Sequence, residues 1–428
     1  MRLPLTRAQL AWAFYDWANS AYWTLIGTFI FAAYFTQAVA SDVALGTAQW
    51  GYTLTITGLT VAILCPLSGA IADAAGRRKP WLGLTTLLTI GCCALLWFVR
   101  PDPAYVGLAL VLVGLANIGG ELSQMFYNAM LADIVPPDRI GRLSGWGWSL
   151  GYAGALVCLV LALLLFVQAD PPLFGLDKET AEHVRIVGPL VAVWYAVFAL
   201  PLFMFTPDRR ATGRPLGAAV VQGVRTLRRT LMEVRRYRDT ALYLVAHMLY
   251  ADGLNTLFVF GAIYAAGTFG MDVAEVTLFG IVLNVTSGLG AFAFAWVDDW
   301  IGPKRTIILS LIGLVLCGTI ALVAPDKAAF WVGASMIGIF LGPTQAASRS
   351  LMTRLSPPAM RTEMFGLYAL SGKATAFVGP FLLSTVTLTF GNQRAGMATI
   401  IVFLLLGLGL LLAVREPPAE AAVLPAAA

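Results

Sequence analysis

Long apolar segments recur along almost the whole chain, and they limit its possible folds more than any other feature. About 20 apolar residues are enough for a helix to cross a bilayer. Only 12% of the 428 residues are charged, whereas a soluble domain has about 25%. The sequence therefore predicts an all-α, multi-pass membrane protein. The twelve predicted spanning helices cover 10–38, 49–72, 80–99, 104–132, 141–168, 186–206, 240–267, 273–298, 304–324, 328–353, 362–388 and 395–414.

Lys and Arg are distributed unevenly between the predicted loops. If the N-terminus is cytoplasmic, 21 of the 28 Lys and Arg lie in inner segments and 5 in outer segments. Cytoplasmic loops of membrane proteins carry the excess of positive charge, so we expect both termini to be cytoplasmic. We expect an inner or plasma membrane in preference to a vacuolar one. This topology accounts for the net charge of +5, and we expect no nucleic-acid partner.

One long basic segment divides the chain. Residues 208–239 hold nine Arg, and Val220, Val224, Leu227, Leu231 and Val234 recur every three or four positions. This pattern predicts an amphipathic helix on the cytoplasmic membrane surface. The predicted domains are a six-helix bundle at 1–207, this linker at 208–239, a second six-helix bundle at 240–415 and a disordered tail at 416–428.

An internal repeat relates the two halves. The loop at 69–79, GAIADAAGRRK, matches the loop at 295–305, AWVDDWIGPKR, and QMFYNAMLADIVPP at 124–137 aligns with QAASRSLMTRLSPP at 345–358. A looser match is Asp-x-x-Asn, at Asp16 and Asn19 and again at Asp252 and Asn255. Two similar six-helix halves joined by a long loop are typical of one transporter architecture.

The loop at 69–79 resembles the hallmark loop of the major facilitator superfamily, although Ala74 stands where that family usually has Arg. FYDWANSAY (14–22), YADGLNT (250–256) and GPTQAASRS (342–350) resemble the autophagy-related vacuolar amino-acid effluxer-like branch of that superfamily. The resemblance spans both halves. The candidate gating residues in the two loops are Asp73, Gly76, Arg77, Arg78, Asp299, Gly302 and Lys304.

Ionisable side chains inside spanning helices cost roughly 2.5 to 3.5 kcal/mol each on insertion scales, so each needs an explanation. In the fold that this chain resembles, the first, fourth, seventh and tenth helices line the central cavity, and each of these carries a charge here. The structural alternative is fixed ion pairing between helices. The candidate substrate or coupling residues are Asp16, Asn19, Glu121, Gln124, Asn128, Asp252, Asn255, Gln345, Arg349 and Lys373. Asp16 is expected at the inner gate or paired with Arg349, and Asp252 or Glu121 is expected to carry the coupling proton.

The predicted function is secondary active transport of a small polar solute by alternating access, by a monomer in the bilayer. The resemblance implies amino acids and export, coupled to protons in preference to sodium. Drug or peptide efflux and cation-coupled sugar uptake stay open, as does a non-transporting sensor or scaffold. No catalytic motif or phosphate-binding loop is found, and the five Cys lack metal-ligand spacing with His. We therefore expect neither an enzyme nor a resident cofactor or metal.

Overall fold

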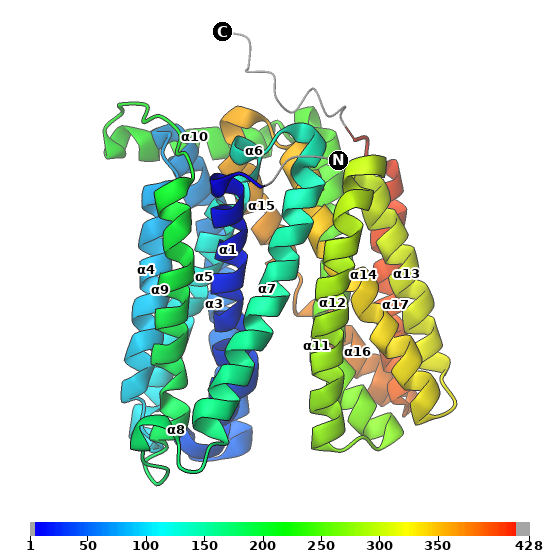
Figure 1. Cartoon of the computed structure of the whole chain (residues 1–428). Coiled ribbons are helices and arrows are strands. Elements are labelled where there is room, and N and C mark those ends of the chain that lie inside the picture. The colour runs from blue at the N-terminus through cyan, green and yellow to red at the C-terminus, as the bar shows by residue number, and fades with distance from the viewer. Residues whose placement is uncertain (1–4, 417–428) are drawn as a thin grey trace. The chain divides into compact units, whose positions relative to one another are not determined.

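A computed structural model of the chain describes residues 5–416, and every regular element among them is helical. The predicted disordered tail, apart from Glu416, lies outside the described residues. The helices of the first half are α1 (Arg7–Ala21), η1 (Tyr22–Phe29), α2 (Ile30–Tyr34), η2 (Phe35–Val39), α3 (Val43–Ala75), α4 (Lys79–Leu95), α5 (Val106–Ala129), α6 (Leu131–Ile134), α7 (Ile140–Ala162), η6 (Leu163–Val167), α8 (Glu182–Arg185) and α9 (Val187–Phe205) (Figure 1).

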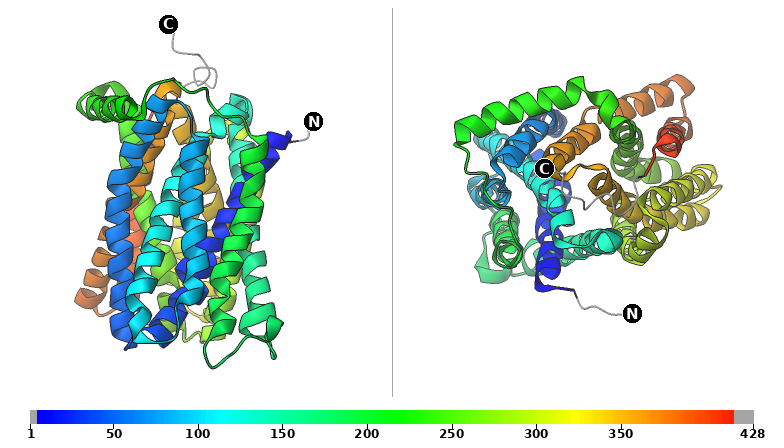
Figure 2. Two further views of the ribbon diagram at one scale, coloured as in Figure 1. Left: turned by 90° about the vertical axis from the view of Figure 1, so that its left-hand side faces the viewer. Right: turned by 90° about the horizontal axis from the view of Figure 1, so that it is seen from above.

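The second half begins with a helix that lies across the ends of its neighbours, α10 (Leu216–Met232) (Figures 1 and 2). It falls inside the predicted linker, where the sequence places an amphipathic helix. Short 3-10 turns at 96–98, 103–105, 137–139, 173–175, 234–237 and 358–360 join other elements. The remaining helices are α11 (Arg238–Phe269), α12 (Val273–Ile301), α13 (Pro303–Val323), α14 (Lys327–Leu355), α15 (Arg361–Lys373), α16 (Val378–Phe390) and α17 (Gln393–Ala413).

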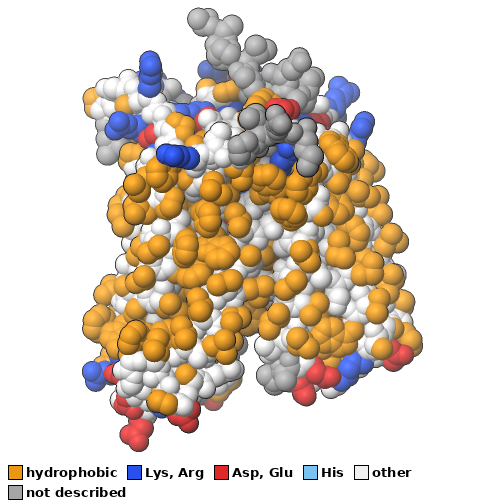
Figure 3. All heavy atoms as spheres, viewed as in Figure 1, with side chains coloured by type: hydrophobic (Ala, Val, Ile, Leu, Met, Phe, Trp, Pro, Cys, Tyr) orange, Lys and Arg blue, Asp and Glu red, His pale blue; other side chains and the backbone are white. Residues whose placement is uncertain are grey.

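Ten helices in the described part of the chain are long and apolar enough to cross a membrane. The two predicted spans outside this set are the first, 10–38, and the tenth, 328–353. The first is divided among α1, η1, α2 and η2, and within η1 the Thr28 hydroxyl donates to the carbonyl of Trp23, five residues back. Hydrophobic side chains cover the middle of the helices and Lys and Arg gather at one end (Figure 3). We call this the basic end; its cytoplasmic placement stays a prediction.

The predicted span at 362–388 falls within one of these ten candidate spans, but its helix is interrupted. Helix α15 ends at Lys373, residues 374–377 form a turn, and α16 starts at Val378. Pro380 has no N–H to continue the helical ladder, and the N–H of Gly379 donates to Asp252 on α11. A continuous helix would need the backbone N–H groups of residues 379 and 380. Pro380 has none and the N–H of Gly379 is bound by Asp252, so the helix is interrupted here.

The described chain forms two compact units. Among the described residues, unit 1 comprises 5–64, 76–127 and 150–212, and unit 2 comprises 65–75, 128–149 and 213–416. The ends of α3, α5 and α7 at the basic end are therefore grouped with the helices of the second half. All contacts described below lie within one unit.

Helices α12 and α14 approach each other closely because glycines line their contact. A Cβ atom on Gly342 would overlap the carbonyl oxygen of Ser287, and one on Gly290 would overlap that of Ile339. Small residues at such contacts let membrane helices pack backbone to backbone. Gly318 on α13 has no heavy atom within 4 Å of its Cβ position, so it offers a matched comparison.

We expect Gly342→Ala to destabilise the purified protein by about 1–3 kcal/mol, because the added methyl must push two backbones apart. The measurement is the thermal unfolding midpoint in detergent. Gly318→Ala should change the free energy of unfolding by less than about 0.5 kcal/mol, so its midpoint should match that of the wild type. Equal midpoints for the two variants would show that the α12–α14 contact is not tight.

Candidate functional site

The first repeated loop, at 69–79, brings the end of α3 into contact with the start of α15. Gly76 follows the last turn of α3 with a φ of +92°, which favours glycine. The carboxylate of Asp73 accepts hydrogen bonds from the hydroxyl of Thr362, at 2.6 Å, and from the backbone N–H of Glu363, at 2.9 Å. The first N–H groups of a helix lack internal partners and attract negative charge. Asp73 therefore caps α15.

The second repeated loop makes the equivalent contact with α7. Gly302 has a φ of +88° at the end of α12. Asp299 accepts a hydrogen bond from the backbone N–H of Arg142 at 3.0 Å, and its other oxygen lies 3.1 Å from Nε of the same residue. Each motif carboxylate thus caps a helix that the sequence assigns to the other half of the repeat.

Basic residues of the same loops bind helix C-termini. Nζ of Lys79 donates to the carbonyl oxygen of Thr206, just beyond α9. Nζ of Lys304 donates to the carbonyl oxygens of Leu412 and Val414, at 2.9 and 2.6 Å, at the end of α17. A cation at a helix C-terminus is stabilised by unpaired carbonyls. The two halves therefore share this type of contact as well as the sequence repeat.

The other two basic residues of the first loop differ from each other in their exposure. Arg77 is exposed, whereas Arg78 is almost fully buried and its backbone N–H donates to Asp208 at 3.0 Å. In the second half, the backbone N–H of Lys304 donates to Glu416 at 3.3 Å. An acid after the last helix of each half therefore caps α4 or α13.

Arg349 is buried in α14 and joins three helices. Its Nε donates to Oγ of Ser144 at 2.9 Å, and a terminal nitrogen donates to the Ser144 carbonyl at 2.6 Å. The other terminal nitrogen donates to Oδ1 of Asn128 at 3.2 Å, and the guanidinium lies 5.7 Å from the ring centroid of Trp148. The repeat aligns Asn128 with Arg349, and the structure brings the two together. The fork of Arg donors suits this multi-point contact better than Lys does.

Asp252 lies on α11 at the break between α15 and α16. Its Oδ2 accepts the N–H of Gly379 at 3.2 Å, while Oδ1 is buried and has no hydrogen-bond partner. The side chain thus caps α16, although one oxygen is unsatisfied. The adjacent Lys373 ends α15 and is half-buried.

In unit 1, α1 and α5 bring two predicted residues together. Nδ2 of Asn19 donates to Oε1 of Gln124 at 2.7 Å. Asp16, one turn away on α1, is 4% exposed, and Glu121 on α5 is partly buried. Beside them, the hydroxyl of Tyr15 lies 2.6 Å from that of Thr86. The first half therefore has a buried polar layer between α1, α4 and α5.

The two Asp-x-x-Asn segments of the repeat, at 16–19 and 252–255, lie in different environments. Asn19 is buried and hydrogen-bonded, whereas Asn255 is exposed. Gln345 is partly buried on α14, one turn from Arg349. Spacings of three or four residues keep each pair on one helical face, but the helices turn these faces toward different surroundings.

Sequence reasoning missed a neutral network in unit 2. The hydroxyl of Tyr250 lies 2.7 Å from Oγ of Ser348, and the hydroxyl of Tyr243 donates to the Ser348 carbonyl at 2.8 Å. Nδ1 of His247 lies 2.8 Å from Oγ of Ser371. None of the predicted site residues is a Tyr or a Ser, so these partners were not among them. Tyr243 and Tyr250, seven residues apart on α11, were an available signal.

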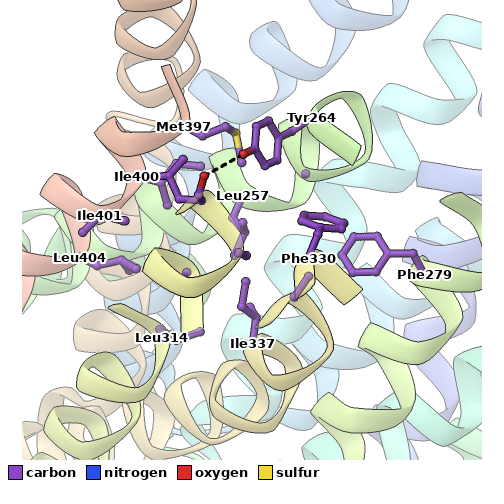
Figure 4. Close-up of a pocket in the computed structure, with 15 residues that line it drawn as sticks. Leu257, Tyr264, Phe279, Leu314, Phe330, Ile337, Met397, Ile400, Ile401 and Leu404 are labelled. Carbon is purple, nitrogen blue, oxygen red and sulfur yellow. Dashed lines mark hydrogen bonds between the residues drawn. The ribbon is translucent and has the colours of Figure 1, made fainter. Parts of the chain in front are cut away.

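The described part of the chain also holds a cavity of about 50 Å³ away from every predicted site residue. It lies between α11, α12, α13, α14 and α17 and is lined by Leu, Ile, Phe and Ala side chains (Figure 4). The hydroxyl of Tyr264 donates to the carbonyl of Leu322 at 3.3 Å. Such a lining offers little to a polar solute. The described residues contain no group of three His, Cys, Asp or Glu placed to hold a metal ion.

Solved structures define the class of this fold. The proton:xylose symporter XylE superposes with a TM-score of 0.74 at 12% identity, covering 96% of each chain. The human organic anion transporter MFSD10 gives a TM-score of 0.71 at 15% identity, covering 96% of this chain and all of that one. The protein has the fold of the major facilitator superfamily, and it is a multi-pass integral membrane protein.

The family follows from sequence comparison. The family model described as "Vacuole effluxer Atg22 like" matches residues 135–422, and the chain belongs to this family. The uncharacterized MFS-type transporter YxiO of Bacillus subtilis is 25% identical over 97% of this chain and 96% of its own. Autophagy-related protein 22-1 of Penicillium rubens is 25% identical over 64% of this chain but only 49% of its own length. The family description and the name of YxiO identify transporters, not enzymes, and the full-length bacterial match supports a cell membrane.

Removing each motif carboxylate should loosen only the helix that it caps. We expect Asp73→Ala to speed amide hydrogen exchange in residues 361–366, and Asp299→Ala to speed it in 140–145, each about tenfold, because one charged hydrogen bond of about 1.5–3 kcal/mol is lost. Exchange is measured by mass spectrometry on the purified protein. Each variant is the control for the other. Equal effects of both variants on both segments would contradict separate caps.

Proposed function

We propose that the protein is a proton-coupled secondary transporter that exports a small polar solute, with amino acids favoured, by alternating access. It acts as a monomer. Membership of a transporter family supports the transport part of this proposal. Solute, direction and coupling rest on the arrangement of charged side chains and on the family resemblance.

The observation that carries the coupling proposal is Asp252 at the broken helix. A buried carboxylate oxygen without a partner is costly, whereas a protonated oxygen carries no net charge. Protonation of Oδ1 leaves the other oxygen available to the Gly379 N–H, and deprotonation strengthens that bond by adding charge. Binding or release of this proton thus acts directly on the joint between α15 and α16.

The contacts at the basic end supply the gate. The carboxylates of Asp73 and Asp299 hold α3 to α15 and α12 to α7. Asp133 adds an ion pair with Arg361 at 3.3 Å. Access from the basic end requires these contacts to break. These contacts are few in number and lie at one end of the helices, so opening that end requires only these bonds to break.

The charges inside the helices favour a zwitterionic solute. Within unit 2, Arg349 and Lys373 supply cations and Asp252 supplies a carboxylate. An amino acid presents both a carboxylate and an ammonium group to such a set. The family description, vacuole effluxer, supports export. Protons are preferred to sodium because the described carboxylates do not gather into an oxygen cage of the kind that a metal cation prefers.

We expect purified protein in liposomes to move at least one amino acid under an imposed proton gradient. The measurement is uptake of a labelled panel of amino acids, sugars and nucleosides, compared with protein-free vesicles and with vesicles whose gradient has been collapsed by an ionophore. Flux confined to sugars or nucleosides would overturn the solute assignment. No flux across the whole panel would overturn transport itself.

Asp252→Asn should abolish gradient-driven uptake while retaining solute exchange without a gradient, because an amide still accepts the Gly379 N–H but cannot exchange a proton. Asp102→Asn makes the same change at an exposed loop position, where an amide oxygen still accepts the Ala104 N–H, so it is the matched control and should behave as wild type. Uptake is compared at equal amounts of reconstituted protein. Normal gradient-driven uptake by Asp252→Asn would remove Asp252 from the coupling role.

A further inference from the structure

Helix α10 has three distinct faces, which follow from its sequence and burial. Ala219, Gly223 and Thr230 are buried and share one side of the helix. Val224 and Leu231 lie on the next side and are 47% and 57% exposed. Positions four and seven apart fall on one helical face, so the exposed residues form an apolar stripe. Arg225 and Arg228 are exposed beyond it.

The buried face of α10 lies across the joint between α3 and α15. A Cβ atom on Gly223 would lie only 2.8 Å from Cα of Ile71, so α10 touches the backbone of α3 one turn from Asp73. The Thr230 side chain lies beside the carboxylate of Glu363, without a hydrogen bond to it, and the backbone N–H of Glu363 is bound by Asp73. Helix α10 thus contacts both partners of the cap that closes this joint.

The exposed face of α10 suits a lipid surface with negative charge. Apolar side chains beside Arg on a helix that lies across the ends of spanning helices are typical of interfacial helices. Helix α10 lies at the basic end, where Lys and Arg gather (Figures 1 and 3). Anionic lipid headgroups attract Lys and Arg near the membrane surface.

We propose that α10 is a lipid-dependent clamp on the α3–α15 joint. Its Val224–Leu231 face, with Arg225 and Arg228, binds an anionic leaflet, and this binding holds the Gly223–Thr230 face against Ile71 and Glu363. Anionic lipid therefore stabilises the closed joint, and its absence releases it. The clamp does not depend on which solute is carried.

The test compares full-length protein in nanodiscs of phosphatidylcholine with nanodiscs containing about one-third phosphatidylglycerol. A bimane label on Val224→Cys should shift its emission to the blue with phosphatidylglycerol; the five native Cys are buried. In the unlabelled wild type, hydrogen exchange in 361–366 should slow about tenfold. The proposal would be overturned if the bimane emission were the same with and without phosphatidylglycerol, or if the emission shifted while exchange in 361–366 did not slow.

A pair of charge-matched variants separates a specific clamp from general attraction. We expect Arg225→Gln with Arg228→Gln to remove most of the lipid effect on exchange in 361–366, about a tenfold change, because each Arg contributes to surface binding. Arg210→Gln with Arg214→Gln removes the same charge from the preceding loop, where both side chains are exposed, and should retain the full effect. Equal loss in both double variants would contradict the proposal.

Discussion

Carboxylates that cap helix N-termini hold the basic end of this transporter together. Asp73 binds the first turn of α15, and Asp299 binds the first turn of α7. Each bond combines a charged acceptor with donors that the helix itself cannot satisfy, so it is stronger than a bond between neutral groups. The positions of α3, α7, α12 and α15 at this end depend on the two caps.

The two halves use the same contacts in some places and depart from symmetry in others. Lys79 and Lys304 both bind the end of the last helix of their own half. Asn19 and Asn255, in contrast, share only a spacing, since one is buried and the other exposed. The loop contacts are therefore duplicated, whereas the interior polar groups differ between the two halves.

The sequence was sufficient for the helical class, for every spanning segment as a helical region and for the pairing of motif loops. Those features arise from local hydrophobicity and from a repeat that is visible in the letters. The break at 374–377 was missed because it depends on Asp252, a residue more than a hundred positions away, taking the Gly379 N–H. Ser144 was missed as a partner of Arg349 because a serine in an apolar helix carries no signal of its own. The candidate charges were found by their cost in a membrane, but their partners depend on tertiary packing.

The central claim is that the joint at the basic end must open in every transport cycle. Trp146 on α7 and Trp296 on α12 have ring centroids 5.7 Å apart beside the Asp299 cap. The most direct measurement is solute flux through a Trp146→Cys, Trp296→Cys protein joined by a short reducible bismaleimide, with each single variant as control. Flux that stops on cross-linking and returns on reduction is the predicted result, and undiminished flux through the cross-linked protein would contradict the account.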